Sequence, residues 1–410
     1  MELTADLGAR LVDTLHAVHG EHSGHRAAHA KGACCNATFI ASSAGTALTR
    51  ALHFDGTAVA ATVRFSNGSG IPTYPDYARS DGRGMAVKFA LADGSHADMV
   101  ALTLPVFFAR DPESFMEFLQ VTRPDPETRQ PDLAAIGAYL ERHPETQAAL
   151  GAAMAPDLPA SYLRARYNGI HAFKMTNAES ISQWVRYRWE PDGGETKTSS
   201  DEARAGGRDY LQDELRARLA NQAANFNLVL ILAAEGDSLV DPTVAWPEDR
   251  ERVLAGRLEV AGMEPDGTCE NLVFDPTNVV SGIDLSDDPI LHARSAAYTV
   301  SYAARRGLTA PAPATGSHPE GAGTRAIAAT QDLATGAMRA MELATGRVTV
   351  ANVDGRLLAF QDACPHRGCS LADGILVGRV VTCGCHGSQF DVTTGAVLKG
   401  PAKAPIQTFG

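Results

Sequence analysis

Four metal-ligand residues near the end of the chain constrain its fold more than any other feature. Cys364 and His366 form a Cys-x-His pair, Cys383 and His386 form a Cys-x-x-His pair, and 16 residues lie between the two pairs. Two thiolates can hold one iron of a 2Fe-2S cluster while two imidazoles hold the other. Mixed Cys/His ligation also suits zinc. The glycine-rich loops around both pairs, each with an additional cysteine, favour the iron-sulfur cluster.

The surrounding stretch, CPHRGC followed by CGCHGS, resembles the Rieske 2Fe-2S family in the form found in its cytochrome bc-complex branch. The resemblance covers about residues 325–410 and implies a small all-β domain with the cluster at its tip. It also implies that Cys369 and Cys385 form a disulfide that bridges the two ligand loops. The hydroxyl of Ser388, which follows the last ligand, is then expected to hydrogen-bond a cluster sulfur, and such donors stabilise the reduced cluster.

The alternation of residues before the first ligand pair predicts a β-hairpin. Two apolar runs, 348–353 and 356–360, flank the dipeptide Asp354-Gly355. Asp-Gly is favoured in two-residue hairpin turns because both central positions require positive φ.

The remaining composition limits the class of protein and its partners. The net charge of -12 makes binding to nucleic acid or an anionic membrane surface unfavourable. No apolar run has the length of a membrane span, and the first twenty residues lack the basic start and apolar core of a secretory signal. We therefore expect a cytoplasmic enzyme. Three cysteines, Cys34, Cys35 and Cys269, are left without an assigned role.

Five histidines with a spacing of three or four residues begin near the N-terminus: His16, His19, His22, His25 and His29. Their spacing could place neighbours on one helix face. However, Gly20 and Gly24 interrupt the helix, and no carboxylate or cysteine completes a ligand set, so we expect no metal site here. The last member, His29, belongs to a different motif.

Around His29 the sequence reads RAAHAKG, and further motifs follow in order at 63–66 (VRFS), 82–89 (GRGMAVKF), 105–111 (PVFFARD), 241–247 (DPTVAWP) and 274–278 (FDPTN). Together they resemble the catalase superfamily, and most closely its small catalase-related haem peroxidases, over about residues 10–306. The resemblance implies an antiparallel β-barrel with surrounding helices and a buried haem b. With the C-terminal domain, the expected class is α+β.

The resemblance also implies an axial ligand for the haem iron. Arg294 and Tyr298 form an R-x-x-x-Y motif at the position of the catalase phenolate ligand. Arg294 lies one helical turn before Tyr298, so its guanidinium can reach the phenolate oxygen. A fixed positive charge favours the phenolate over the phenol, and the phenolate is the form that binds iron.

On the opposite haem face, the resemblance makes His29 the acid-base residue and Ser66 the residue that orients its imidazole. A neutral imidazole can take a proton from one peroxide oxygen and return it to the other. Thr103 stands where catalases have a distal Asn, and its hydroxyl offers a shorter donor with different geometry. Losing one donor aimed at developing charge typically slows a reaction about a hundredfold or more. We therefore expect slower peroxide dismutation. Ala28 stands where large catalases have a bulkier Val before the distal His, so we also expect a roomier pocket, which favours an organic substrate.

Four more residues are assigned to haem binding by the resemblance. Arg26, Arg64 and Arg305 align with the arginines that hold the haem propionates, a task suited to a planar charged fork. Phe115 aligns with an aromatic residue packed near the haem face, although an ordinary core role would explain it almost as well.

The chain is predicted to have three parts: a catalase-like domain at 1–306, a linker at 307–324 and a Rieske domain at 325–410. Proline and glycine make up much of the middle segment, and its apolar residues show no regular spacing typical of a helix or a strand.

Two redox centres on one chain narrow the expected function. A catalase needs no electron donor, because a second peroxide supplies the electrons, whereas a Rieske cluster carries one electron at a time. The leading hypothesis is a haem oxidoreductase that acts on a small organic molecule with peroxide or dioxygen, with electrons relayed through the cluster. An external reductase or ferredoxin and a homodimer are the expected partners. The alternatives are a peroxide-removing peroxidase fed by a reductase, a non-redox haem isomerase or dehydratase, and a sensor, which the lack of an effector domain disfavours.

Overall fold

The computed structural model describes residues 5–409 except 79–80, 126, 129, 156, 266, 307–332, 334–335, 344–345, 354 and 385–386. The predicted linker and two of the predicted site residues, Cys385 and His386, lie outside the described part. The chain divides into two compact units, 1–301 and 302–410. Within the described residues, no helix combines the length and the apolar character needed to cross a bilayer.

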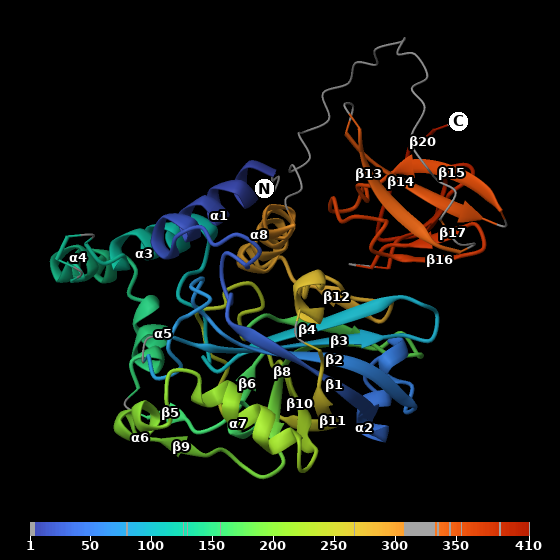
Figure 1. The fold of residues 1–410 in the computed structure, drawn as a ribbon. Coiled ribbons are helices and arrows are strands. Elements are labelled where there is room, and N and C mark those ends of the chain that lie inside the picture. The colour runs from blue at the N-terminus through green and yellow to red at the C-terminus, as the bar shows by residue number, and fades with distance from the viewer. Residues whose placement is uncertain are drawn as a thin grey trace. The chain divides into compact units, whose positions relative to one another are not determined.

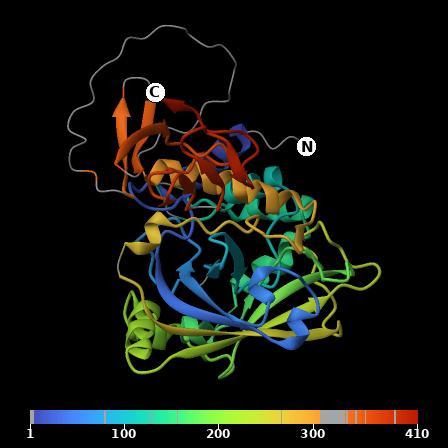
Figure 2. The ribbon, with the colours of Figure 1, turned by 90° about the vertical axis from the view of Figure 1, so that its right-hand side faces the viewer.

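The first unit is built on an antiparallel β-barrel (Figures 1 and 2). Its strands follow the order β10 (Ala224–Leu232), β11 (Arg252–Met263), β1 (Gly32–Ala41), β2 (Ala58–Asn67), β3 (Arg83–Ala90), β4 (His96–Leu102), β6 (Tyr167–Asn168) and β8 (Ser182–Pro191). The barrel closes because β8 pairs with β10 as well, and β7 (Phe173–Thr176) and β12 (Ile283–Leu285) extend the sheet beyond β8. Closure leaves these eight strands without free edges, as the expected catalase-like fold requires.

The barrel interior is filled by alternate residues of the strands. On β1, Phe39 is completely buried, while its neighbour Ile40 is 48% exposed, which is the period of two expected for a strand with one buried face. Phe65, Phe89 and Phe226 from three other strands are also completely buried. Because these rings fill the barrel interior, we expect a functional site at the ends of its strands.

Helices lie on two sides of the barrel, above and below its strands in the view of Figure 1. Above the strands lie α1 (Ala5–His19), α3 (Pro112–Thr122) and α8 (Pro289–Arg305), which bury Leu7, Leu11, Met116 and Ala293 against one another. Below the strands lie α6 (Ser200–Ala205) and α7 (Tyr210–Leu219), and the remaining helices are α2 (Ser43–Thr46), α4 (Leu133–Arg142) and α5 (Thr146–Ala153). Short 3-10 turns are η1 (Leu52–Phe54), η2 (Tyr162–Arg164) and η3 (Thr268–Asn271), and the short strands β5 (Leu158–Pro159) and β9 (Lys197–Thr198) pair with each other.

The end of α1 separates the five histidines into two groups. The helix stops at His19, and Gly20 follows with a φ of 83°, a conformation that glycine adopts without a steric penalty. His16 and His19 therefore lie in the last turn of α1, whereas His22, His25 and His29 lie in the loop that leads to β1.

The second unit contains two small antiparallel sheets. One has the order β13 (Met338–Leu343), β14 (Gly346–Val353), β15 (Arg356–Gln361) and β20 (Thr408–Phe409). The other has the order β16 (Ile375–Val377), β17 (Val380–Thr382), β18 (Gln389–Asp391) and β19 (Val397–Lys399). The predicted hairpin is confirmed, because Val353 pairs with Arg356 across a two-residue turn in which Gly355 has a φ of 84°.

Candidate haem and iron-sulfur sites

His29 occupies a backbone conformation that is rare for its residue type. Its φ is 54°, in the left-handed region, and such a residue costs about 1–3 kcal/mol unless its surroundings hold it. Two contacts hold it here: its N–H donates to Gly68 O at 3.0 Å, and its carbonyl accepts from Arg64 Nη2 at 2.9 Å. The loop between α1 and β1 therefore presents this imidazole in one fixed direction.

The imidazole of His29 lies against the end of β2. Its Nδ1 is 3.0 Å from the hydroxyl oxygen of Ser66, which leaves Nε2 for other partners. A Cβ on Gly84, the β3 residue paired with Ser66, would lie 2.8 Å from that hydroxyl and 2.9 Å from His29 Cε1, so only glycine fits. Burial, and then the charges of Arg64, Arg294 and other arginines, lower the pKa of His29 to about 3. The imidazole is therefore neutral at physiological pH and can accept a proton.

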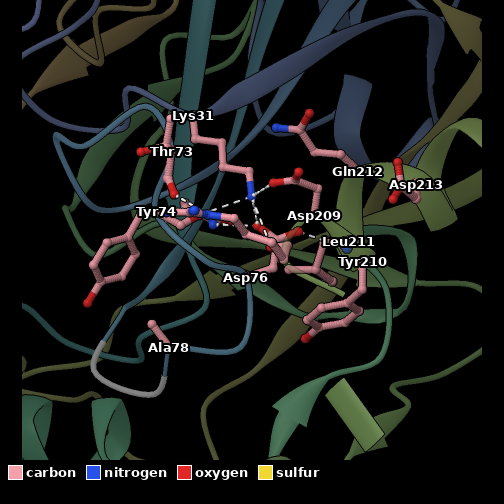
Figure 3. Close-up of polar contacts among 12 residues, drawn as sticks. Lys31, Thr73, Tyr74, Asp76, Ala78, Asp209, Tyr210, Leu211, Gln212 and Asp213 are labelled. Carbon is pink, nitrogen blue, oxygen red and sulfur yellow. Dashed lines mark hydrogen bonds and ion pairs between the residues drawn. The ribbon is translucent and has the colours of Figure 1, made fainter. Parts of the chain in front are cut away.

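An ion-pair cluster around the buried Lys31 anchors the same loop two residues further on. The Lys31 amino group lies 2.5 Å from Asp76 and 2.6 Å from Asp209 (Figure 3). Asp76 also accepts a hydrogen bond from Asn67 at 2.8 Å and another from Leu211 N, in α7, at 2.9 Å. Asn67 directly follows Ser66. The cluster thus ties the His29 loop, the end of β2 and the start of α7 together.

Thr103 lies at the same end of the barrel as Ser66. The register pairs Ser66 with Gly84 and Gly84 with Leu102, the residue before Thr103. The Thr103 hydroxyl accepts a hydrogen bond from Arg83 N at 3.0 Å. The hydroxyl proton is then the single donor that this side chain can offer to a bound molecule.

The predicted axial ligand lies in a chain of four polar side chains. Arg294 donates from Nε and Nη2 to the Tyr298 oxygen, at 3.2 and 2.9 Å. Its Nη1 is 2.9 Å from His171 Nε2, and His171 Nδ1 is 2.6 Å from an Asp288 carboxylate oxygen. Burial opposes the charge of Arg294, but the Tyr298 oxygen, together with Tyr187 and Asp275, outweighs burial and raises the pKa of Arg294. A permanent cation therefore faces the phenol oxygen.

His171 and Asp288 were not found by sequence reasoning. The position of Asp288 could have been recognised in the sequence, because Asp directly before Pro289 is typical of the start of a helix. Its carboxylate indeed caps α8, accepting from Ile290 N at 2.8 Å. His171 lies 123 residues from Arg294 in an unremarkable stretch, so no local pattern could have revealed it.

The three arginines assigned to the propionates differ in their surroundings. Arg64 is buried and donates from Nη2 to the carbonyls of His29 and Ala30. Arg26 pairs with Glu270 at 2.7 Å. Arg305 belongs to the second unit, where its guanidinium lies 4.8 Å from the ring centre of Tyr302. Their roles toward a haem stay predictions.

Phe115 packs between two apolar clusters. Its ring centre lies 4.9 Å from that of Phe107, and it also contacts the cluster that contains Ala293 of α8. The ring therefore lies beside the helix that carries Tyr298, which suits either predicted role.

The donor set of the first unit fits a haem. Tyr298 offers an oxygen stabilised by two Arg294 donors, and His29 offers a neutral imidazole whose Nδ1 is already engaged. Arg26 uses only three of its five N–H groups on protein acceptors, so donors remain for a carboxylate. Tyr298 would hold the iron, His29 would face its opposite side, and Arg26 would bind a propionate.

In the second unit, Cys364 and Cys383 are both buried and neither is in a disulfide. A hydrogen bond with the Cys383 side chain, followed by burial, raises the pKa of Cys364, so a cation is needed to stabilise two thiolates here. Ser388 is completely buried and its side chain hydrogen-bonds that of Cys364, while its predicted hydrogen bond to a cluster sulfur stays a prediction. The site therefore fits an iron-sulfur cluster.

The other predicted cluster residues are described only in part. Cys369 is in a disulfide, but its predicted partner Cys385 lies outside the described residues. His366 is described and follows Cys364 by two positions, whereas His386 is not. The complete ligand set stays a prediction.

Comparisons with known proteins support the resemblance stated for each of the two parts of the chain. Residues 6–312 match the catalase family, and residues 324–410 match the Rieske [2Fe-2S] domain. A catalase-related peroxidase of Mycolicibacterium paratuberculosis is 38% identical over 72% of this chain and 94% of its own length. One of Synechococcus elongatus is 32% identical over 73% of this chain and 89% of its own length.

The fold of the first unit is also found in solved structures. A fungal catalase aligns with a TM-score of 0.63 and 27% identity, covering 72% of this chain and 62% of its own. A bacterial catalase aligns with the same TM-score and 25% identity, over 60% of its own length. This chain thus spans about three fifths of those two catalases.

Proposed function

Because the chain belongs to the catalase family and also carries a Rieske [2Fe-2S] domain, we propose that it oxidises a small organic molecule with peroxide or dioxygen and relays electrons through its cluster. The enzyme is a haem and iron-sulfur oxidoreductase. The haem iron supplies the oxygen-binding redox centre, and the cluster supplies single electrons. An external reductase or ferredoxin is the proposed electron partner.

The observation that supports this proposal most is the hydrogen bonding of the Thr103 hydroxyl. Its hydroxyl already accepts from Arg83 N, so a bound peroxide would meet at most one hydroxyl donor there. A cavity of about 290 Å³ is lined by Thr103, Leu104, Pro105 and Arg188 among others, but His29, Ser66 and Tyr298 are not part of its lining. Weak positioning of peroxide at Thr103 supports an organic substrate over rapid peroxide dismutation.

The chain's own residues would divide the work around a bound haem. The neutral imidazole of His29, oriented by Ser66, would take a proton from one oxygen of the oxidant and return it to the departing oxygen. The Tyr298 oxygen, which accepts two hydrogen bonds from Arg294, would hold the iron.

A second candidate is peroxide removal with electrons from a reductase. It is supported by the two relatives that align over most of their length, since both are named catalase-related peroxidases.

The expected cytoplasmic location and homodimer stay predictions. A disulfide in the first unit, between Cys34 and Cys269, is more common in oxidising compartments.

The stoichiometry of peroxide consumption tests the proposal. Dismutation releases one dioxygen for every two peroxides, whereas the relayed reaction releases none. One peroxide takes up only two electrons, from the donor or from the substrate, while one dioxygen takes up two from the donor through the cluster and two from the substrate. With NAD(P)H, a ferredoxin reductase, dioxygen and an organic substrate, we therefore expect one NAD(P)H to be oxidised for each substrate molecule oxidised.

The variant Cys364→Ser removes a predicted cluster ligand and leaves the haem residues in place, so it should lose donor oxidation and keep its haem spectrum. Dioxygen release that accounts for all peroxide in the wild-type protein, with donor present, would show that the proposed relay is wrong. Donor oxidation that needs no organic molecule would favour the second candidate.

A further inference from the structure

A disulfide joins two distant parts of the first unit. Cys34 of β1 and Cys269 of η3 are 235 residues apart in sequence, and their Cα atoms are 5.7 Å apart. Both are buried, at 4% and 6% exposure, in an apolar cluster with Val100 and Phe274. Buried sulfurs exchange slowly with outside thiols, so this bridge is a fixed link rather than an exchange site.

The segment that the bridge fixes has little regular structure of its own. η3 is a single 3-10 turn of four residues, and no side chain caps its start, where Gly267 adopts a φ of 86°. The chain leaves it at Leu272 in an extended conformation. A turn of this size has no strand or helix ladder to locate it, so the covalent link to β1 is its firmest attachment.

η3 supplies three acceptors to one arginine. Arg26 donates from Nη1 to the Glu270 carboxylate at 2.7 Å, and from Nη2 to Cys269 O at 2.6 Å and Leu272 O at 2.9 Å. One of these carbonyls belongs to the bridged cysteine itself. The guanidinium plane is thus set by groups whose position depends on the bridge.

Arg26 lies three residues before His29, in the same loop between α1 and β1. Its charge is one of those that disfavour protonation of His29. Of its five N–H groups, the three contacts above leave one on Nη1 and the one on Nε for another acceptor. A carboxylate such as a haem propionate is the acceptor that suits a charged planar fork.

We propose that the Cys34–Cys269 disulfide is a positioning element of the haem site, which fixes η3 so that η3 aims Arg26 at a haem carboxylate. This inference rests on the haem-binding part of the proposed function and is independent of the substrate and of the electron relay.

The next residue in the chain provides a matched control. Cys35 points to the opposite face of β1, is completely buried and is not in a disulfide. Burial raises the pKa of its thiol to about 12, so it does not compete for the bridge. Cys35→Ser removes a thiol from the same strand and leaves η3 and Arg26 untouched.

The test measures haem release to apomyoglobin from the full chain. Without the bridge, in C34S/C269S, we expect release to be on the order of tenfold faster, because an ordered charged hydrogen bond is lost. Cys35→Ser should release haem at the wild-type rate. In an Arg26→Ala background, removing the bridge should add nothing further.

An equal acceleration with and without Arg26 would mean that the bridge is only a general staple, and wild-type release from C34S/C269S would also overturn the proposal. Non-reducing peptide mapping must find Cys34 and Cys269 linked, and free thiols at both would refute it. If C34S/C269S does not fold, Glu270→Ala decides whether η3 aims Arg26, since it keeps the bridge and removes one Arg26 partner. Its haem release should be faster, and an unchanged rate counts against the inference. A wild-type chain that takes up no haem would instead contradict the proposed function.

Discussion

His53 is a buried histidine that the proposed chemistry does not use. It lies in η1, is completely buried, and stacks on Phe89 with ring centres 4.7 Å apart. Neither of its ring nitrogens hydrogen-bonds a described residue. Burial lowers the pKa of His53 to about 3. The protein therefore holds this imidazole neutral at a pH where an unfolded chain would protonate it.

The sign and size of the effect on stability follow from linkage. The unfolded state has the ordinary pKa of about 6.5 and binds more protons, so stability is present above that pH and falls as pH decreases toward 3. Each pH unit in this window removes about 1.4 kcal/mol. His53→Leu, close in volume and unable to titrate, should therefore gain about 2 kcal/mol relative to wild type between about pH 6.5 and 4.5.

Urea unfolding at several pH values, followed by tryptophan fluorescence, measures this difference. All three tryptophans, Trp184, Trp189 and Trp246, belong to the first unit, so the signal reports on the unit that contains His53. His25→Leu, which removes an exposed imidazole, is the matched control. Wild-type and His53→Leu curves that stay parallel down to about pH 4.5 would refute the reasoning.

Three further predictions concern the haem site. Thr103→Asn restores an amide donor and should raise dioxygen release from peroxide about tenfold to a hundredfold, measured with an oxygen electrode, and no increase would contradict the role given to Thr103. Tyr298→Phe removes the oxygen that Arg294 contacts, so the purified protein should lose its Soret band and keep the EPR signal of the reduced cluster; a full haem content would show that another residue is the ligand. Gly84→Ala places a Cβ 2.9 Å from His29 Cε1, so it should slow cyanide binding to the ferric protein by about tenfold in stopped flow. The control Gly82→Ala meets only Leu104 side-chain atoms at 3.3 Å, and equal rates in both variants would contradict the prediction.

The sequence was most informative where function depends on residues close together in the chain. The Arg294–Tyr298 contact could be predicted because helix geometry brings positions four apart together, and the structure shows both hydrogen bonds. The 354–355 turn could be predicted because few residues tolerate positive φ.

Contacts across the barrel could not be predicted in this way. The Cys34–Cys269 bridge joins residues 235 positions apart, and nothing in the sequence distinguishes Cys34 from Cys35. Only the pleat of β1 decides that one thiol faces η3 and the other the barrel core, where a shift of one residue would exchange them. The role of His171 could not be predicted for the same reason, because its partners, Asp288 and Arg294, lie more than a hundred residues away in the sequence.

The measurement that tests the central claim most directly is rapid-freeze EPR, with parallel optical spectra, after protein with a reduced cluster and ferric haem is mixed with one equivalent of peroxide. If the cluster relays electrons to the haem, the reduced-cluster signal disappears as the oxidised haem species decays. A cluster that stays reduced while the peroxide is consumed would show that the haem works alone and that the Rieske domain serves another partner.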